Sequence, residues 1–285
     1  MTDPVLSVRN LNIHFHGATR TTHAVRGVSF DLGHEKLGIV GESGSGKSQT
    51  GRAIMKLSAP SARVTADALR FGATDLMAAS EKQMRTIRGR DIAMILQDPK
   101  FSLNPLMKVG KQIAEAYRIH HRVSAAEARQ KALAMLESVH IRNPERVYEI
   151  LPHEVSGGMG QRIMIAMMLI PEPKLIIADE PTSALDVTVR RQVLAVLDEL
   201  VERTGASLIF ISHDLNLVAD FCDRVLVMYA GRVLEDLPAR DLGRAQHPYT
   251  RALLDSLPRL DDPRAELAVM QRQDSWRTAP IGGQA

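Results

Sequence analysis

The chain has 285 residues, of which 45% are hydrophobic and 24% charged, and this ordinary globular composition excludes a disordered chain. Its 36 Lys and Arg against 33 Asp and Glu leave a net charge of +3, too small an excess to indicate a nucleic-acid partner. The single cysteine, Cys222, excludes a disulfide framework and a four-cysteine metal site.

Hydrophobic periodicity predicts strands and one helix in the first hundred residues. Hydrophobic and polar residues alternate through Leu11, Ile13 and Phe15, and again through residues 28–32, as in half-buried strands. Residues 36–40 form a short apolar run typical of a buried strand, a glycine-rich turn follows, and residues 49–57 predict a helix. Residues 92–96 predict a second buried strand.

The middle of the chain is predicted to be almost entirely helical. Residues 108–120 and 124–139 carry apolar side chains three and four positions apart. Ser124 is a suitable N-cap for the second helix, with Glu127 placed for a capping box.

Strands return in the last third of the chain. Residues 174–178 and 207–211 predict buried strands, with a helix over 189–203 between them. A hairpin is expected over residues 225–235, around Ala230-Gly231. The pattern as a whole predicts an α/β core interrupted by a helical insertion. We find no signal peptide and no apolar run long enough to cross a bilayer, so other chains would have to do any crossing.

Residues 41–48 match the phosphate-binding pattern GxxxxGK[ST], between a predicted strand and a predicted helix. Glycines in such a loop let backbone N–H groups point at phosphate oxygens, and the helix N-terminus adds partial positive charge. Lys47 would place its charge on the β- and γ-phosphates, and the Ser48 hydroxyl would bind Mg²⁺. A glycine-rich turn with a chance lysine is the alternative interpretation.

Two carboxylates end the predicted strand at 175–178. Asp179 would lie beside Mg²⁺ there, and Glu180 would lie where an attacking water waits. An ordinary acidic turn before Pro181 is the alternative. Together with the phosphate-binding loop, the pair predicts a nucleotide hydrolase.

A second glycine-rich helix start occurs at residues 155–161, Val-Ser-Gly-Gly-Met-Gly-Gln. Ser156 can cap the helix that follows, while Gly157 and Gly158 expose N–H groups at its start, which makes a second anion site. Because one loop already covers the phosphates of one nucleotide, this site suggests recognition of a nucleotide held by another subunit. A helix cap without a ligand is the alternative.

These motifs, in this order, resemble the ATP-binding subunit of an ABC transporter over roughly residues 5–235. The resemblance implies a P-loop NTPase (RecA-like) α/β core with an N-terminal antiparallel β subdomain and an inserted α-helical signature subdomain at about residues 100–172. It implies an ATP-binding domain over residues 1–235. Residues 236–285 would be a C-terminal extension, partly helical with a frayed end.

The same resemblance implies a role for each matching residue. Gln97 would link Mg²⁺ and the attacking water to a membrane partner, Glu180 would polarise the water, and His213 would contact the γ-phosphate. Mg²⁺ would be held by Ser48, Gln97 and Asp179. The implied ATP-binding residues are Phe15, Gly41, Glu42, Ser43, Gly44, Ser45, Gly46, Lys47, Ser48, Gln49, Ser156, Gly157, Gly158 and Asp186. Phe15 would stack on adenine, or it is a core aromatic of its strand.

Two positions depart from the family pattern. Val155 replaces the usual leucine, which is a mild change. Gly160 occupies a position where the family usually has a polar or basic residue, and glycine there costs about 1 kcal/mol relative to alanine in a helix. We therefore expect Gly160 to loosen the signature helix, while Ser156, Gly157 and Gly158 are intact.

A narrower resemblance is to the oligopeptide, dipeptide and nickel importer ATPases. It is carried by residues 40–48, by Gln97-Asp98-Pro99 with Leu103-Asn104-Pro105, and by His247-Pro248-Tyr249-Thr250, which is also a good helix start. This group often holds an iron–sulfur cluster near the C-terminus, but no cysteine follows Cys222.

The implied partners are a second ATPase subunit, in a heterodimer, two transmembrane permease subunits and an extracytoplasmic solute-binding protein, with no nucleic acid. The implied location is the cytoplasmic face of the bacterial inner membrane, as a peripheral protein. Peptide import is the main hypothesis, and nickel or another metal complex is the alternative substrate. Further alternatives are a soluble ABC ATPase, an exporter ATPase and a regulatory subunit without activity.

Overall fold

The computed structural model describes residues 3–17, 19–183, 185–256 and 276. It divides into two compact units, one made of Met1–Ala78 with Phe210–Ala285 and the other of Ala79–Ile209. The division of the chain at residue 235 stays a prediction. Ala184 and the expected frayed end, residues 278–285, lie outside the described residues.

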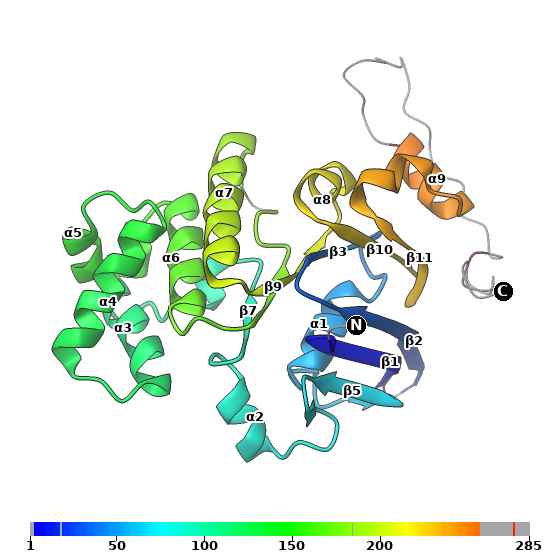
Figure 1. The fold of residues 1–285 in the computed structure, drawn as a ribbon, viewed down its shortest axis with the longest axis horizontal. Helices are drawn as coiled ribbons and strands as arrows, with labels where there is room; N and C mark the ends of the chain where they lie inside the picture. The colour runs from blue at the N-terminus through cyan, green and yellow to red at the C-terminus, as the bar shows by residue number, and fades with distance from the viewer. Residues whose placement is uncertain (1–2, 18, 184, 257–275, 277–285) are drawn as a thin grey trace. The chain divides into compact units, whose positions relative to one another are not determined.

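An antiparallel sheet is built from strands within residues 6–75 of the first unit (Figure 1). Its long strands β1 and β2 alternate buried and exposed side chains, as the sequence predicts, and the register shifts near Asn10, whose φ is 50°. The strand order is β2-β1-β5-β6, with β4 also paired to β1. The strands are β1 (Leu6–His16), β2 (Thr21–Leu32), β4 (Ala62–Thr65), β5 (Ala68–Phe71) and β6 (Thr74–Asp75).

A second group of strands in the first unit carries the phosphate-binding loop. Strand β3 (Lys36–Val40) leads into the loop, and helix α1 (Lys47–Ile54) follows it. Strand β10 (Arg224–Tyr229) pairs in parallel with β3 and antiparallel with β11 (Arg232–Pro238), which confirms the predicted hairpin. The other helices in the described part of this unit are α8 (Leu215–Phe221), the 3-10 helix η3 (Ala239–Arg244) and α9 (Pro248–Asp255).

Two parallel strands of the second unit, β7 (Ile92–Ile95) and β8 (Leu175–Asp179), are buried throughout and pair from Ile92↔Leu175 to Ile95↔Ala178. Helix α2 (Glu81–Ile87) precedes β7, and helix α7 (Val187–Thr204) follows β8. Strand β9 (Ser207–Ser212) crosses the boundary between the two units along the chain.

The helical insertion lies wholly within the second unit. Figure 1 shows α3, α4, α5 and α6 gathered as a group of green helices, with α7 beside α6, and packing contacts join these helices. Ser124 caps α4 by accepting a hydrogen bond from the Glu127 N–H, as predicted, but the capping box predicted with Glu127 does not form. The elements are η1 (Pro99–Phe101), α3 (Val109–His120), α4 (Ala125–Ser138), α5 (Pro144–Glu149), η2 (Pro152–Glu154) and α6 (Gly157–Leu169).

The structure corrects some of the elements predicted from the sequence. The helix predicted over residues 49–57 begins at Lys47 and ends at Ile54, and Leu57 beyond it is half exposed. The short strands β4 to β6 and helix α2 were not predicted, because they are too short for a clear periodicity. No helix in the described part of the chain is long and apolar enough to span a bilayer.

Candidate nucleotide-binding site

The phosphate-binding loop passes very close to strand β10, and its glycines permit this. A Cβ on Gly41 would lie 2.0 Å from the Met228 carbonyl oxygen, and the Gly41 φ of 147° is also one that favours glycine. Gly46, at φ 101°, ends the loop at the N-cap of α1. No larger residue fits at Gly41 without moving the backbone.

Lys47 is the first residue of α1 and its side chain folds back over the loop. It is only 6% exposed, and its Nζ donates hydrogen bonds to the carbonyls of Gly41 at 2.7 Å and Glu42 at 3.0 Å. The ammonium is thus held inside the loop by backbone oxygens. Ser43 and Gly44, at the tip of the loop, are exposed, so an anion can approach the loop from solvent.

Two supports behind the loop could not be predicted from the sequence. The Gly231 N–H, in the turn between β10 and β11, donates to the Ser45 carbonyl at 3.0 Å. The Tyr249 hydroxyl, on helix α9, accepts a hydrogen bond from the Glu42 N–H at 3.1 Å. Gly231 and Tyr249 both lie far from the loop in sequence, so no local sequence pattern indicates that they support it.

Phe15 and His213 belong to the same unit as the loop. Phe15 is half-buried near the end of β1, where it pairs with Thr22 and with Ala62. It is therefore not a fully buried core aromatic, and part of its ring surface is accessible. His213 directly follows β9 and is exposed, and the next residue, Asp214, caps α8 through the Leu217 N–H.

The second unit brings Gln97, Asp179 and Glu180 to one sheet edge. Because β7 and β8 are parallel neighbours in register at Ile95↔Ala178, the residues after both strands leave the sheet at the same end. Asp179 is 5% exposed, whereas Gln97 is exposed.

Glu180 adopts a backbone conformation that is uncommon for its residue type. Its φ is 52°, in the left-handed region, which costs a residue with a Cβ about 1 kcal/mol. Its carbonyl accepts hydrogen bonds from the N–H and the hydroxyl of Ser183, at 3.3 and 3.2 Å. Such strain is concentrated at functional sites, and here it sets the direction in which the chain leaves β8.

The signature residues form the start of α6. Ser156 has the extended backbone of an N-cap, but its hydroxyl makes no cap hydrogen bond, so the predicted capping by this side chain is wrong. Ser156 is exposed, and its hydroxyl can bond to water instead. Gly157 is also exposed and has open space where a Cβ would lie, so the helix N-terminus can take an anion from solvent.

Gly160 does not interrupt the signature helix. Helix α6 runs unbroken from Gly157 to Leu169, with Gly160 buried inside it. A Cβ there would lie 3.5 Å from Cγ of Pro99, at ordinary contact distance. Gly160 lies next to the segment that follows Gln97, and the space there would also hold an alanine. The expected loosening of α6 is not seen in this geometry.

Asp186 caps helix α7. Its carboxylate accepts hydrogen bonds from the backbone N–H groups of Thr188 and Val189, both at 3.0 Å, while the side chain stays exposed. Such a cap fixes the end of the loop that precedes α7. The cap was not predicted, although an aspartate before a helix is its usual signal.

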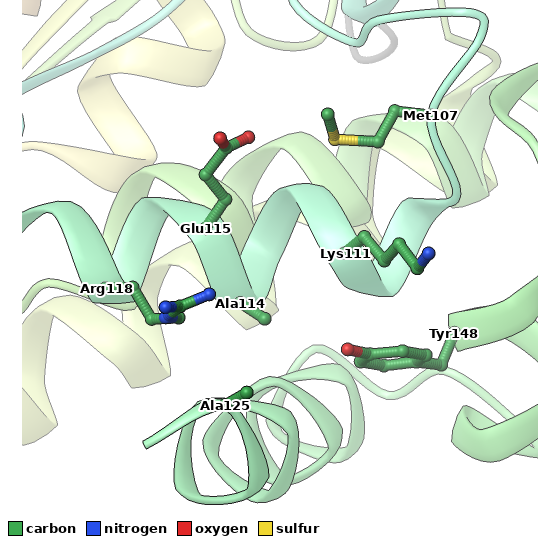
Figure 2. Close-up of a pocket in the computed structure, with 7 residues that line it drawn as sticks. All are labelled: Met107, Lys111, Ala114, Glu115, Arg118, Ala125 and Tyr148. Carbon is green, nitrogen blue, oxygen red and sulfur yellow. The ribbon is translucent and has the colours of Figure 1, made fainter. Parts of the chain in front are cut away.

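A separate pocket of about 340 Å³ lies in the helical insertion. Figure 2 shows Lys111 and Arg118 on the side of α3 that is turned toward the Tyr148 ring of α5, whereas the Glu115 carboxylate points away from that ring. Met107 lines the same pocket, and the neighbouring Leu106 is 90% exposed. This surface is apolar with a charged rim.

Comparison with known proteins agrees with this arrangement. The ABC transporter family model matches residues 25–183. The chain is 52% identical over 259 residues to the probable peptide ABC transporter ATP-binding protein y4tR of Sinorhizobium fredii, covering 90% of this chain and 77% of the relative. It is 50% identical over 268 residues to the dipeptide transport ATP-binding protein DppD of Bacillus subtilis, covering 93% and 80%.

A solved structure shares the fold. The dimeric, post-hydrolysis structure of the ATP-binding cassette MJ0796, bound to ADP and Pi, superposes with a TM-score of 0.74 at 26% identity, covering 82% of this chain and 99% of that one. A phosphate-binding loop between strand and helix, with an inserted helical group that carries a second glycine-rich helix start, defines an ATP-binding cassette. The chain belongs to the ABC transporter family, and the fold class predicted from the sequence is confirmed.

Proposed function

We propose that the chain is the ATP-hydrolysing subunit of an ABC importer that takes up peptides through separate permease subunits. The observation that carries this proposal is the phosphate-binding loop, in which Lys47 is buried on the carbonyls of Gly41 and Glu42 at the start of α1. Peptide as the substrate is supported by the names of the relatives, which include peptide, dipeptide and oligopeptide transport proteins.

The loop would hold the phosphates of ATP, and each predicted site residue keeps its role as part of this proposal. Lys47 would neutralise charge on the β- and γ-phosphates, and Phe15 would stack on adenine through its accessible ring face. Glu180 would polarise the attacking water, with Gln97 orienting it and His213 contacting the γ-phosphate. The unusual backbone of Glu180 would aim its carboxylate.

The residues present fit a magnesium ion. Mg²⁺ takes one or two carboxylates together with phosphate oxygens and water, and does not need a cage of protein ligands. Asp179, a carboxylate at a strand end that is 5% exposed, suits this role, and Ser48 and Gln97 would each supply an oxygen atom. Among the described residues no cluster of three His, Cys, Asp or Glu forms a cage. The ion would neutralise phosphate charge during hydrolysis.

Two exposed surfaces support the proposed partners. The start of α6, with Ser156 and Gly157 exposed, would close on the γ-phosphate held by a second ATPase subunit, and Asp186 would couple the two sites. This second subunit is proposed to be a different chain. The apolar surface around Leu106 and the pocket beside it suits a contact with the permease subunits. The chain would then lie at the cytoplasmic face of the inner membrane. A solute-binding protein on the other side of the membrane would deliver the substrate to the permease subunits.

The test is transport by the assembled complex. The chain is purified with the membrane proteins that bind it, reconstituted in proteoliposomes with ATP, and supplied with a labelled tripeptide or with Ni²⁺. We expect ATP-dependent uptake of the tripeptide that Lys47→Ala abolishes. Uptake of Ni²⁺ alone would assign the alternative substrate, and purification without any membrane protein would favour a soluble ABC ATPase.

A further inference from the structure

One peptide group of the phosphate-binding loop is held at both of its ends. The peptide that joins Gly41 to Glu42 donates its N–H to the Tyr249 hydroxyl at 3.1 Å, and its carbonyl accepts from Lys47 Nζ at 2.7 Å. Because a trans peptide is planar, its N–H and C=O point in opposite directions, so these two bonds fix its rotation. The two bonds also polarise one another through the peptide group, which strengthens both.

The tyrosine itself is held rigidly. Tyr249 is fully buried, and its ring centroid lies 4.5 Å from that of Tyr229 and 5.7 Å from that of Trp276. Trp276 is 5% exposed and also contacts Tyr229 edge-on at 6.0 Å. These three residues form an aromatic cluster, in which Tyr229 ends the strand behind the loop.

The backbone next to Tyr249 is also fixed. Tyr249 is the second residue of α9, and its N–H donates to Nδ1 of His247, the N-cap, at 3.1 Å. The His247 N–H in turn donates to Glu235 on β11 at 2.9 Å. The helix start His247-Pro248-Tyr249-Thr250 thus aims the Tyr249 hydroxyl at the loop.

We propose that Tyr249 is a positioning residue for the phosphate-binding loop: it fixes the Gly41–Glu42 peptide, and through that peptide the amine of Lys47, for binding nucleotide phosphates. The C-terminal segment therefore acts on nucleotide affinity. The proposal rests on the nucleotide-binding role of the loop. It predicts an effect on phosphate binding and none on the chemical step, because the Tyr249 hydroxyl acts through the Glu42 N–H of the loop.

The variant Tyr249→Phe removes the hydroxyl and keeps the ring. We expect the KM for ATP and the Kd for ADP to rise about fivefold, the factor for one lost hydrogen bond of about 1 kcal/mol, while kcat at saturating ATP stays unchanged. Tyr229→Phe is the matched control, since it makes the same change in the neighbouring ring of the cluster, and it should leave both constants unchanged.

Two further measurements separate positioning from packing. Trp276 is the chain's single tryptophan, so its emission reports whether the aromatic cluster is intact, and it should be the same in both variants and the wild type. Hydrogen–deuterium exchange of the loop peptide should quicken in Tyr249→Phe alone. Unchanged KM and Kd in Tyr249→Phe would overturn the proposal. So would raised values that come with an altered Trp276 emission, because packing alone would then explain them.

Failure of this proposal differs from failure of the proposed function. A wild-type complex that binds ADP but does not hydrolyse ATP would contradict the proposed function. The ADP affinities of the two variants would still decide the role of Tyr249.

Discussion

Gly158 lies directly against Val189: a Cβ on Gly158 would be 2.3 Å from Val189 Cγ1, where α6 meets α7. That distance is far below any contact real side chains make, so a larger residue at Gly158 must displace the Val189 side chain or α7 with it. We expect Gly158→Ala to destabilise the protein by about 2 kcal/mol, in the range found for overpacked sites. Thermal unfolding of the purified variant measures this.

Gly157→Ala separates the structural from the functional role of the two glycines. No atom lies within 4 Å of a Cβ at Gly157, so this variant should unfold like the wild type. Its ATP hydrolysis in the assembled complex should nevertheless fall, because the methyl would occupy the exposed helix start where a partner's phosphate approaches. Full activity of a stable Gly157→Ala complex would contradict the proposed role of the start of α6 in binding the partner's γ-phosphate.

Gly160→Ala should stabilise the protein. Alanine is favoured over glycine inside a helix by about 1 kcal/mol, and its Cβ would meet Pro99 at 3.5 Å, an ordinary contact. The midpoint of chemical unfolding should therefore rise, with ATP hydrolysis retained. A lower midpoint would show that α6 and the segment after Gln97 are packed too tightly for a methyl group.

The cap at His247 predicts a dependence on pH. Burial lowers the pKa of His247 below its ordinary value, against the opposing charge of Glu235. The Tyr249 N–H needs an unprotonated Nδ1, so protonation breaks this cap. Because the unfolded chain takes up the proton first, this part of the stability is complete above about pH 6.5 and falls as the pH drops through the lowered pKa.

The matched control for this cap is His247→Asn, since asparagine caps helices but does not titrate. Unfolding followed by Trp276 emission at pH 8 and pH 5 should show a loss in the wild type that exceeds the loss in His247→Asn, by about 1 kcal/mol at most. Equal losses would contradict the assignment.

Arg224 links three parts of the first unit. Its guanidinium donates to Glu35 at 2.8 and 3.1 Å and to Asp236 at 2.8 and 2.9 Å. Burial raises the pKa of Glu35, but the hydrogen bond and the charge of Arg224 lower it by more. The pKa of Glu35 is therefore below its ordinary value. Arg224→Ala should cost about 2 kcal/mol at pH 7, since it leaves a largely buried carboxylate without its cation.

The sign of the acid dependence follows from the lowered pKa of Glu35. In the wild type this contribution is present above the ordinary carboxylate pKa of 4.5 and is lost as the pH falls through the lowered pKa. The difference in unfolding free energy between wild type and Arg224→Ala should therefore shrink between pH 5 and pH 3. A difference that is constant over this range would contradict the pairing.

The core strands and the motif positions could be predicted because their signals are local. The strand at residues 36–40 matched β3 in full, and the phosphate-binding loop lies between a strand and a helix as its pattern requires. The long-range supports could not be predicted. No residue near Glu42 in the sequence indicates that the Glu42 N–H donates a hydrogen bond to Tyr249. Likewise, no residue near Gly158 indicates that Gly158 packs against Val189. The failed cap at Ser156 shows that a suitable residue at the N-cap position need not make the cap hydrogen bond.

Hydrolysis by the complex that carries Glu180→Gln tests the central claim most directly. Glutamine keeps the size of the side chain but cannot act as a base. The account predicts that this complex binds ATP as the wild type does while its steady-state ATP hydrolysis falls at least about a hundredfold. Hydrolysis at the wild-type rate would contradict it.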